Sequence, residues 1–359
     1  MKGRSEELDA KLSRLRSLLA SLGASGAALR SRRNFAWMTA GGDNHVEQAS
    51  DTGVATLLVT AHDVVVLTSV NEAARIRDEE LAGLHIEVVA FPWEIPGAVP
   101  AEISRRAPGR VLDDDELEPH LSMLRSVLLE PEVERVAALG ARTAAAMTRA
   151  LRAVRAGDLE TIVGERLAMD LAADGIRLPV LLVASDERIL KYRHPIPAIK
   201  PIEKSLMVAV CAEVRGLFVS MTRFAWLAGE PDPETLRRFR AVKAINLAFA
   251  EATVAGRQLS AVLADGIAAY NQQGYPEEWR LHHQGGPIAY KSREAVAFHS
   301  SSATIEPGMV FGWNPSITGA KVEDTFVLLP GDGRLVVTVD PSWPVGDPLA
   351  GLGILADNR

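Results

Sequence analysis

The sequence predicts an α/β protein, with mixed α+β character, that is divided into two domains. Short apolar runs of strand type alternate with amphipathic helical stretches in its first third. The remainder follows the order helix, helix, strand pair, helix, helix and strands. The chain has 359 residues, of which 47% are hydrophobic, so it is long enough to bury two cores.

The first domain is expected to span residues 1–129 and to begin with an amphipathic helix. Between Glu6 and Leu22, leucines recur at helical spacing with charged residues between them. Four prolines from Pro92 to Pro108 and a link at Asp113–Leu129 predict little regular structure before the second domain. A helix is expected at Asn71–Leu84, and strands are expected at Ala27–Leu29, Ala55–Thr60, Val64–Thr68 and Ile86–Phe91.

The second domain is expected to span residues 130–359. Four helices are predicted, at Pro131–Arg155, Leu159–Gly175, Pro233–Ala255 and Leu259–Tyr270. Strands are predicted at Leu178–Ala184, Leu206–Glu213 and Leu217–Phe224, with a polar turn at Ser185–Pro201 and a strand-rich end from Leu281 to Val339.

Composition excludes several classes of function. The formal net charge is -7 with both signs interspersed, so a nucleic-acid partner is not expected. The single cysteine, Cys211, excludes an intramolecular disulfide framework and a multi-cysteine zinc cluster. The first residues are charged and no apolar run reaches membrane-spanning length, so we expect no membrane association and a cytoplasmic location.

The segment Ile305–Leu328 carries a family resemblance. It reads Ile-Glu-Pro-Gly-Met-Val-Phe-Gly-Trp-Asn-Pro-Ser and later Lys-Val-Glu-Asp-Thr-Phe. This resembles the last two active-site strands of the pita-bread metallopeptidases, which include methionine aminopeptidase, aminopeptidase P, Xaa-Pro dipeptidase (prolidase) and the metal-free enzyme creatinase. The resemblance covers about residues 130–330, and the first domain resembles the amino-terminal domain of creatinase and prolidase. It implies a pita-bread domain, a hydrolase of peptidase type and a homodimer.

The same resemblance locates the metal-binding positions of these peptidases, which hold two divalent ions with two aspartates, one histidine and two glutamates. Glu323 alone matches its position. The other four positions are occupied by Ala209, Ser220, Gly285 or Gly286, and Asn314. Alanine and glycine offer no donor atom, and serine and asparagine carry no charge to offset a divalent cation. We therefore expect a pseudoenzyme by the family's standard, with no bound metal and no cofactor.

Four residues are candidates for catalysis, namely His194, His282, His283 and Glu323. His194 matches the histidine with which the family contacts its substrate, and a neutral imidazole can donate a proton; the alternative is a loop histidine that caps the backbone. Either His282 or His283 is expected to face the pocket. Glu323 needs a positive partner if it is buried, and it forms either a ligand site or a plain salt bridge.

Further residues of these segments are predicted to bind substrate. Arg223 and Lys321 are the nearest candidates to pair with Glu323. Cys211 shares a strand face with Ala209, so its thiol is either a nucleophile or an inert core group. The predicted substrate-binding set is Arg193, Arg223, Gln284, Tyr290, Asn314, Lys321 and Trp37, with core packing as the alternative for Trp37.

Two functions fit these residues. The first is a metal-independent hydrolase that acts on a small amino-acid-like or amide substrate. The second is a non-catalytic pseudo-peptidase that binds a peptide, a metabolite or a protein partner in the former cleft. In either case the expected ligand is a small molecule or a short peptide.

Overall fold

The computed structural model describes residues 2–343 and 352–354. The chain separates into two compact units: unit 1 comprises residues 1–125 with 215–217, and unit 2 comprises residues 126–214 and 218–359. The units divide between residues 125 and 126, a few residues before the predicted boundary, where the helix α6 (Glu130–Ala153) begins. The predicted α/β class is confirmed, since helices and strands alternate in both units.

Unit 1 is built on a five-stranded sheet with the order β4-β3-β2-β1-β5. β1 and β2 are antiparallel with Ala27 opposite Val59, whereas β1 and β5 are parallel. Helix α1 buries the predicted leucine stripe, and Leu15 is fully enclosed. The elements are α1 (Lys2–Ser21), β1 (Gly26–Ser31), α2 (Arg32–Met38), β2 (Thr52–Thr60), β3 (Val64–Ser69), α3 (Ala73–Arg75), the π-helical η1 (Ile76–Glu80), β4 (Glu87–Phe91), α4 (Ala98–Arg106), β5 (Val111–Asp113) and α5 (Asp114–Ser126).

Unit 1 is more helical than its sequence predicts. The expected link at residues 113–129 is mostly the helix α5, whose acidic first turn favours a helix start and whose Leu117 and Leu121 are buried one turn apart. Helix α4 forms among the prolines because Pro100 lies in its first turn, where the missing N–H has no intrahelical partner. The helix expected at residues 71–84 is shorter, comprising α3 and η1.

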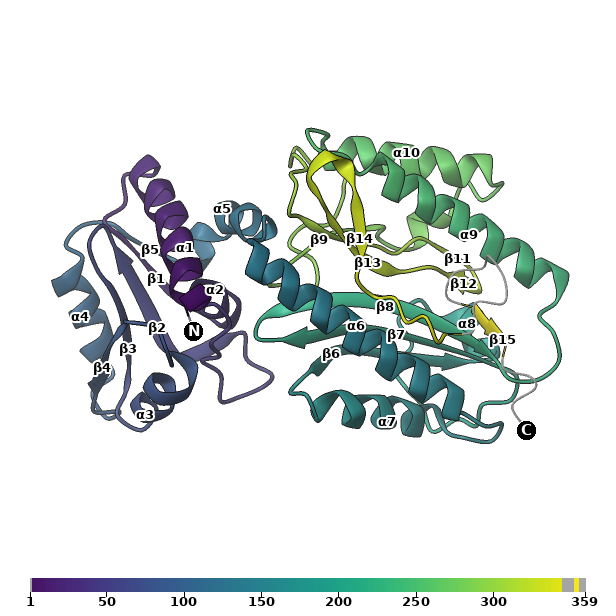
Figure 1. Cartoon of the computed structure of the whole chain (residues 1–359), viewed down its shortest axis with the longest axis horizontal. Coiled ribbons are helices and arrows are strands. Elements are labelled where there is room, and N and C mark those ends of the chain that lie inside the picture. The colour runs from purple at the N-terminus through teal and green to yellow at the C-terminus, as the bar shows by residue number, and fades with distance from the viewer. Residues whose placement is uncertain (1, 344–351, 355–359) are drawn as a thin grey trace. The chain divides into compact units, whose positions relative to one another are not determined.

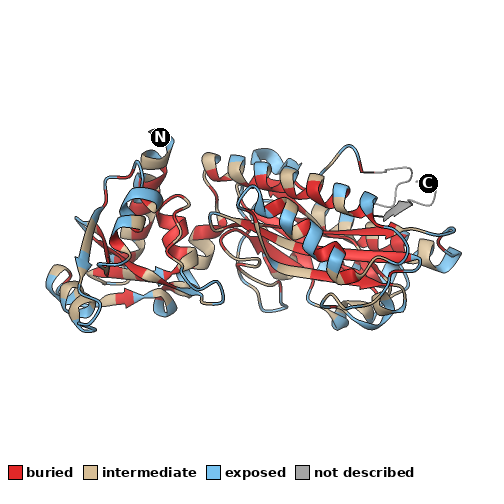
Figure 2. Cartoon of the chain, turned by 90° about the horizontal axis from the view of Figure 1, so that it is seen from below, coloured by how far each residue is buried: buried red, intermediate tan, exposed pale blue. Residues whose placement is uncertain are grey.

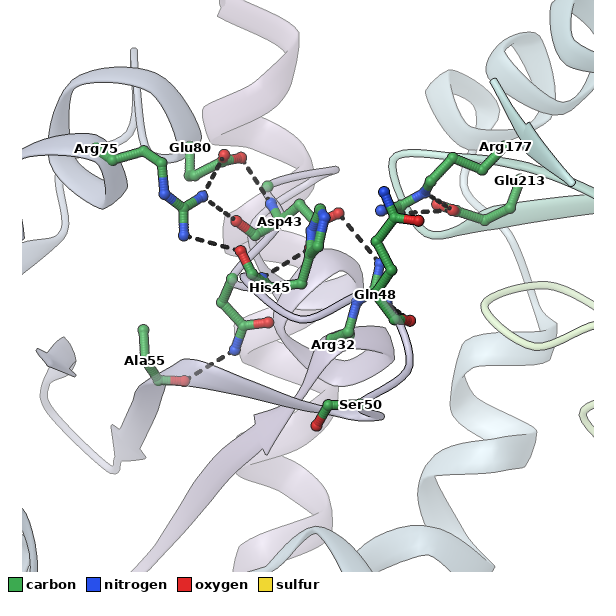
Figure 3. A network of polar contacts seen from close by, with 12 residues as sticks. Arg32, Asp43, His45, Gln48, Ser50, Ala55, Arg75, Glu80, Arg177 and Glu213 are labelled. Atoms are coloured by element: carbon green, nitrogen blue, oxygen red, sulfur yellow. Dashed lines mark hydrogen bonds and ion pairs between the residues drawn. The ribbon is translucent and has the colours of Figure 1, made fainter. Parts of the chain in front are cut away.

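The loop at residues 39–51 of unit 1 is held by η1 and α3 (Figure 3). Arg75 donates from Nη1 to the carbonyl oxygen of Asp43 at 3.2 Å and from Nη2 to that of His45 at 3.1 Å. Glu80 accepts from the backbone N–H of Asp43 at 2.7 Å and pairs with Arg75 at 3.0 Å. The π-helical turn that carries Glu80 therefore fixes the path of this loop.

Unit 2 contains two four-stranded sheets, ordered β15-β8-β7-β6 and β14-β13-β10-β9, and the small ladder β11-β12. Its helices are α6, α7 (Glu160–Ala172), α8 (Glu187–Lys191), α9 (Pro233–Ala252), α10 (Leu259–Gln272) and the 3-10 turns η2 (Glu278–Leu281) and η3 (Pro330–Asp332). Its strands are β6 (Arg177–Ser185), β7 (Ser205–Val214), β8 (Leu217–Trp226), β9 (Gly285–Ile288), β10 (Val310–Trp313), β11 (Ser316–Ile317), β12 (Ala320–Lys321), β13 (Asp324–Leu328), β14 (Arg334–Val336) and β15 (Leu352–Ile354).

The helices of unit 2 flank its sheets on two sides. In Figure 1, α6 and α7 lie along β6 and β7, whereas α9 lies on the side of β11 and β12 and α10 packs against α9. The strands between them are buried along most of their length, while the helices expose their outer faces (Figure 2). None of the helices in residues 2–343 is long and apolar enough to span a membrane. The candidate site lies where the two sheets meet, at a single bridge between Thr222 of β8 and Glu323.

Candidate functional site

Glu323 is a buried carboxylate at the junction of the two sheets of unit 2. The residue immediately precedes β13, and only 3% of its surface is exposed. Its Oε2 accepts from the Thr222 hydroxyl at 2.8 Å and lies 2.9 Å from Lys321 Nζ. Its Oε1 accepts from Arg293 Nη2 at 2.8 Å. Both carboxylate oxygens are thus bound by cationic or hydroxyl groups of the protein.

Arg293 is the partner that the sequence analysis missed. It lies in the segment between β9 and β10, and its Nη1 also donates to the Ser220 hydroxyl at 3.0 Å. The Ser220 oxygen in turn lies 3.2 Å from Cys211 Sγ. The predicted pairing of Glu323 with Lys321 is formed. We call Glu323, Lys321, Arg293 and Thr222 the Glu323 cluster.

The Glu323 cluster holds its carboxylate in the charged form. Burial raises the pKa of the Glu323 carboxyl, but the charges of Lys321 and Arg293 outweigh this effect and lower the pKa from 4.5 to about 2. A carboxylate that is this weakly basic and bound at both oxygens is poorly suited to accept a proton from a substrate.

Arg223 does not pair with Glu323, and this part of the prediction is wrong. Strand alternation places Glu323 and Asp324 on opposite faces. Arg223 lies with Asp324, donating to its carboxylate at 2.8 Å and to the carbonyl oxygens of Thr222 and Thr338 at 2.9 and 2.8 Å. Its guanidinium therefore connects strands on the face away from the Glu323 cluster.

Three histidines gather near the Glu323 cluster, and we call them the histidine trio. His194 follows α8, whereas His282 and His283 precede β9. The Nε2 atoms of His194 and His282 are 2.8 Å apart, and the rings of His282 and His283 stack with centroids 4.3 Å apart. One ring nitrogen from each residue lies within 4.8 Å of the others. Both His282 and His283 thus lie close to His194, but of the two only His282 lines the adjacent cleft.

All three imidazoles favour the neutral form. Burial lowers the pKa of His282 from 6.5 to about 3, and the charge of Lys321 acts in the same direction. Burial and then the charge of Arg293 lower the pKa of His283 to about 4. Burial also lowers the pKa of His194. Neutral imidazoles are donors, acceptors or metal ligands rather than cations that bind an anion.

A small cleft of about 20 Å³, open to solvent, lies beside these residues. Its walls combine the polar side chains of His282, Lys321 and Arg193 with the apolar Met207, Phe224 and Ile317. Apolar walls with a few convergent polar groups are typical of small-molecule sites.

Two side chains near this place have a buried polar atom without a hydrogen-bond partner among the described residues, namely Arg293 at Nε and Asn314 at Oδ1. Asn314 is 3% exposed, and its backbone N–H donates to the carbonyl oxygen of Gln284 at 3.1 Å. Its side-chain Oδ1 is buried and has no hydrogen-bond partner among the residues that the structure describes. Because buried polar atoms are nearly always paired, this oxygen is a candidate acceptor for a ligand or an ordered water.

Comparisons with known proteins agree with this architecture. The sequence profile of metallopeptidase family M24 matches residues 134–330, more than half of the chain. The chain belongs to metallopeptidase family M24. No curated protein gives a significant match to the sequence.

Solved structures extend the similarity to both units of this M24 protein. The chain is similar to an Xaa-Pro dipeptidase from Bacillus anthracis, with 20% identity, a TM-score of 0.74, and coverage of 93% of this chain and 98% of the other. A dipeptidase from Pyrococcus horikoshii gives 19% identity, a TM-score of 0.78 and coverage of 92% and 98%. The N-terminal domain of FACT complex subunit SPT16 from Cicer arietinum gives 13% identity, a TM-score of 0.69 and coverage of 94% and 95%. At such identities the likeness shows the fold alone.

Three residues predicted to bind substrate are engaged by the protein within the M24 fold. Arg193 pairs with Glu278 at 2.6 Å and also donates to the hydroxyls of Ser316 and Thr318. Gln284 accepts from Tyr270 at 2.8 Å and donates to the carbonyl oxygens of Trp279 and His282 at 3.0 and 2.6 Å. Tyr290 donates to Glu132 at 2.6 Å and is buried. These contacts give all three a structural role.

Trp37 lies in an apolar core, whereas the Cys211 thiol lies beside the Ser220 hydroxyl. Trp37 belongs to α2 of unit 1 and is 1% exposed, so it packs in the core there, as its alternative interpretation expected. Burial raises the pKa of the Cys211 thiol, which disfavours the thiolate. Cys211 therefore lacks the activation that a nucleophile needs.

Gly285 and Gly286 adopt backbone conformations with φ of 99° and 154°. A Cβ atom would lie 2.1 Å from the carbonyl oxygen of Gly312 at the first position and 2.3 Å from that of Ala295 at the second. Both contacts are with backbone atoms, which cannot rotate away. The two glycines thus let β9 approach its neighbours more closely than any other residue would allow.

Proposed function

We propose that this M24 protein is a non-catalytic pseudo-peptidase that binds an amino-acid-like or short-peptide ligand in the cleft beside Lys321 and the histidine trio. The observation that carries the proposal is the Glu323 cluster. The carboxylate that the family resemblance identifies as a metal ligand is bound by two cationic side chains of the chain itself. Each cation occupies a side of Glu323 from which a divalent ion would have to approach.

The residues present do not fit the pair of divalent ions that the family name implies. Ala209 has no donor atom, and the Ser220 hydroxyl accepts from Arg293. Lys321 and Arg293 bring two positive charges against the single negative charge of Glu323, so an added dication would meet net repulsion. We therefore assign no step of any reaction to a dinuclear metal centre in this chain.

Two features support a ligand in this region of unit 2. The unpartnered Oδ1 of Asn314 is an acceptor suited to an amine or amide N–H. The apolar walls formed by Met207 and Phe224 suit a small side chain, and the exposed His194 contacts His282, which lines the cleft. A ligand with an amino or amide group and a short apolar part matches this combination.

The second candidate is a metal-independent hydrolase, and the hydrogen-bonded pair of His194 and His282 favours it. Two neutral imidazoles in contact can pass a proton to a leaving group. The described residues around them offer neither a free carboxylate base nor an activated thiol, which is why we prefer the binding function. Release of an amine and a carboxylic acid from a bound small amide would show that the protein is a hydrolase.

Peptide hydrolysis tests the proposal directly. We expect Xaa-Pro dipeptides, and longer peptides with proline in second position, to remain uncleaved with added manganese or cobalt, since no metal-bound hydroxide forms at Glu323. Metal-dependent release of the first amino acid, or two equivalents of metal per chain that are lost in Glu323→Ala, would overturn it.

A thermal-shift screen of amino acids, dipeptides and small amides tests the ligand. A compound that stabilises the protein should do so less in Asn314→Ala and His194→Ala, whereas the exposed control His62→Ala should respond as the unaltered protein does. Absence of any stabilising compound, or an unchanged response in both variants, would contradict a ligand site. The predicted homodimer and cytoplasmic location remain proposals.

A further inference from the structure

The histidine trio has a feature that ligand binding in the cleft does not explain. One ring nitrogen of each histidine can serve as a metal ligand, and these three nitrogens lie within 4.8 Å of one another. His194 and His283 are exposed, while His282 is half-buried between them. Isolated surface histidines rarely converge in this way without a common partner, because each loses solvation and side-chain freedom on approach.

The hydrogen bonds of His282 fix which of its nitrogens is available. Its Nδ1 lies 2.6 Å from the carbonyl oxygen of His283, and a carbonyl oxygen can only accept. Nδ1 must therefore carry the proton, which leaves Nε2 with a free lone pair directed toward His194 Nε2. Metal-binding histidines are commonly oriented in this manner, by donating the other ring N–H to a backbone carbonyl.

We propose that the histidine trio binds one divalent transition-metal ion of the zinc type. Three imidazole nitrogens and an open fourth position form a known ligand set for zinc, and nitrogen-only ligands favour zinc, cobalt, nickel or copper over magnesium or calcium. On binding, His194 loses its Nε2 proton to solvent and takes one up at Nδ1, so it remains neutral and its Nε2 lone pair becomes available to the metal. The expectation that this chain binds no metal is then limited to the position of Glu323.

This site differs from the centre that gives the family its name. None of its three ligands occupies the positions of Ala209, Ser220, Asn314 or Glu323 or of the two glycines of β9. Lys321 and Arg293 are two positive charges that act on these histidines and oppose a cation, and Glu323, which contacts both, offsets one of the two charges. An anionic group at the open fourth position, such as a carboxylate, would offset the remaining charge.

Only small side-chain movements are needed. Zinc–nitrogen bonds of 2.0–2.1 Å in a tetrahedron place the nitrogens about 3.3 Å apart. The Nε2 atoms of His194 and His282, now 2.8 Å apart, must separate slightly. The most distant pair of ring nitrogens, which lies within 4.8 Å, must move closer together. Rotation of the two exposed rings accomplishes both without disturbing buried packing.

Cobalt titration tests this proposal. Tag-free protein is stripped of metal with a chelator, dialysed and titrated with Co²⁺, whose visible ligand-field absorption reports four-coordinate nitrogen binding. We expect one equivalent per chain, displaced by Zn²⁺. Separate His194→Ala, His282→Ala and His283→Ala variants should weaken binding at least about tenfold, as expected when a ligand is lost.

The control is His62→Ala, which removes an exposed histidine of unit 1 and should leave Co²⁺ binding unchanged. Circular dichroism confirms folding, and His→Gln variants at the trio provide a second series should an alanine variant unfold. Absence of saturable binding, or equal affinity in all trio variants, would overturn the metal site. The thermal-shift screen with chelator present is independent of this outcome, so the two proposals can fail separately.

Discussion

The Glu323 cluster and the histidine trio lie in the same region of unit 2 but differ in whether partners within the protein satisfy their polar atoms. Glu323 is buried and bound at both oxygens by fixed partners of the chain. The described polar contacts of His194 and His282 include each other, and His194 and His283 face solvent. The Glu323 carboxylate has its hydrogen-bond partners within the protein, whereas the histidine trio has ring nitrogens that can bind a ligand.

This difference separates what maintains the fold from what can bind. A buried ion pair contributes little net stability, yet removal of one member is costly because the remaining charge is stranded. Exposed imidazoles can be removed at little cost to folding, because water replaces their contacts. Stability and binding should therefore respond to different substitutions, and the following predictions test this separation.

The largest effect is expected for Glu323→Gln. The change leaves Lys321 and Arg293, whose side chains are only 11% exposed, without this negative partner, and loss of one member of a buried pair costs about 3 to 5 kcal/mol. Urea unfolding measures the free energy of unfolding. Glu306→Gln is the matched control, because Glu306 is exposed, and a loss below about 0.5 kcal/mol is expected there. An equal loss of unfolding free energy in both variants would show that Glu323 contributes no more to stability than an exposed glutamate does.

Acidification should act through the same carboxylate. Its pKa is lowered from 4.5 to about 2 on folding, so its contribution to stability is complete above pH 4.5 and is lost as the pH falls toward about 2. Linkage gives a loss of about 3 kcal/mol over this interval. Free energies of unfolding measured across it should have a shallower slope in Glu323→Gln. An identical slope would mean that Glu323 is not held ionised.

Thr222→Val should have an intermediate effect. It preserves the β-branched shape but removes the hydroxyl that donates to Glu323 at 2.8 Å. Hydrogen bonds to charged groups contribute about 1.5 to 3 kcal/mol, and a loss in this range is expected in urea unfolding. The control is Thr52→Val, at an exposed position of β2. A neutral result at Thr222 would show that the two cations alone satisfy the carboxylate.

The smallest effect on stability is expected for His194→Ala. The side chain is exposed, so the free energy of unfolding should change by less than about 0.5 kcal/mol. Cobalt binding should nevertheless weaken at least about tenfold. A loss of stability above about 2 kcal/mol would show that the histidine trio is a structural network like the Glu323 cluster.

The sequence was sufficient for the alternation of helices and strands and for the pairing of Glu323 with Lys321, because both depend on local pattern or on a short motif. Arg293 was missed since it lies 30 residues from Glu323 and belongs to no motif; its only signal was a positive charge in the segment leading to β10. Arg223 was misplaced because motif position alone does not reveal which face of a strand is already occupied by Asp324. Convergence of His194 and His282, separated by 88 residues, depends on the tertiary fold.

The two glycines at the start of β9 limit the evolutionary reversibility of this protein. Aspartates at positions 209 and 220 and a glutamate at position 314 are single exchanges on the existing strands. A histidine at Gly285 or Gly286 is not, because its Cβ would collide with the backbone oxygens of Gly312 or Ala295. With this backbone conformation, point substitutions alone would not restore the histidine ligand. A dinuclear centre would also require a change in the backbone of β9.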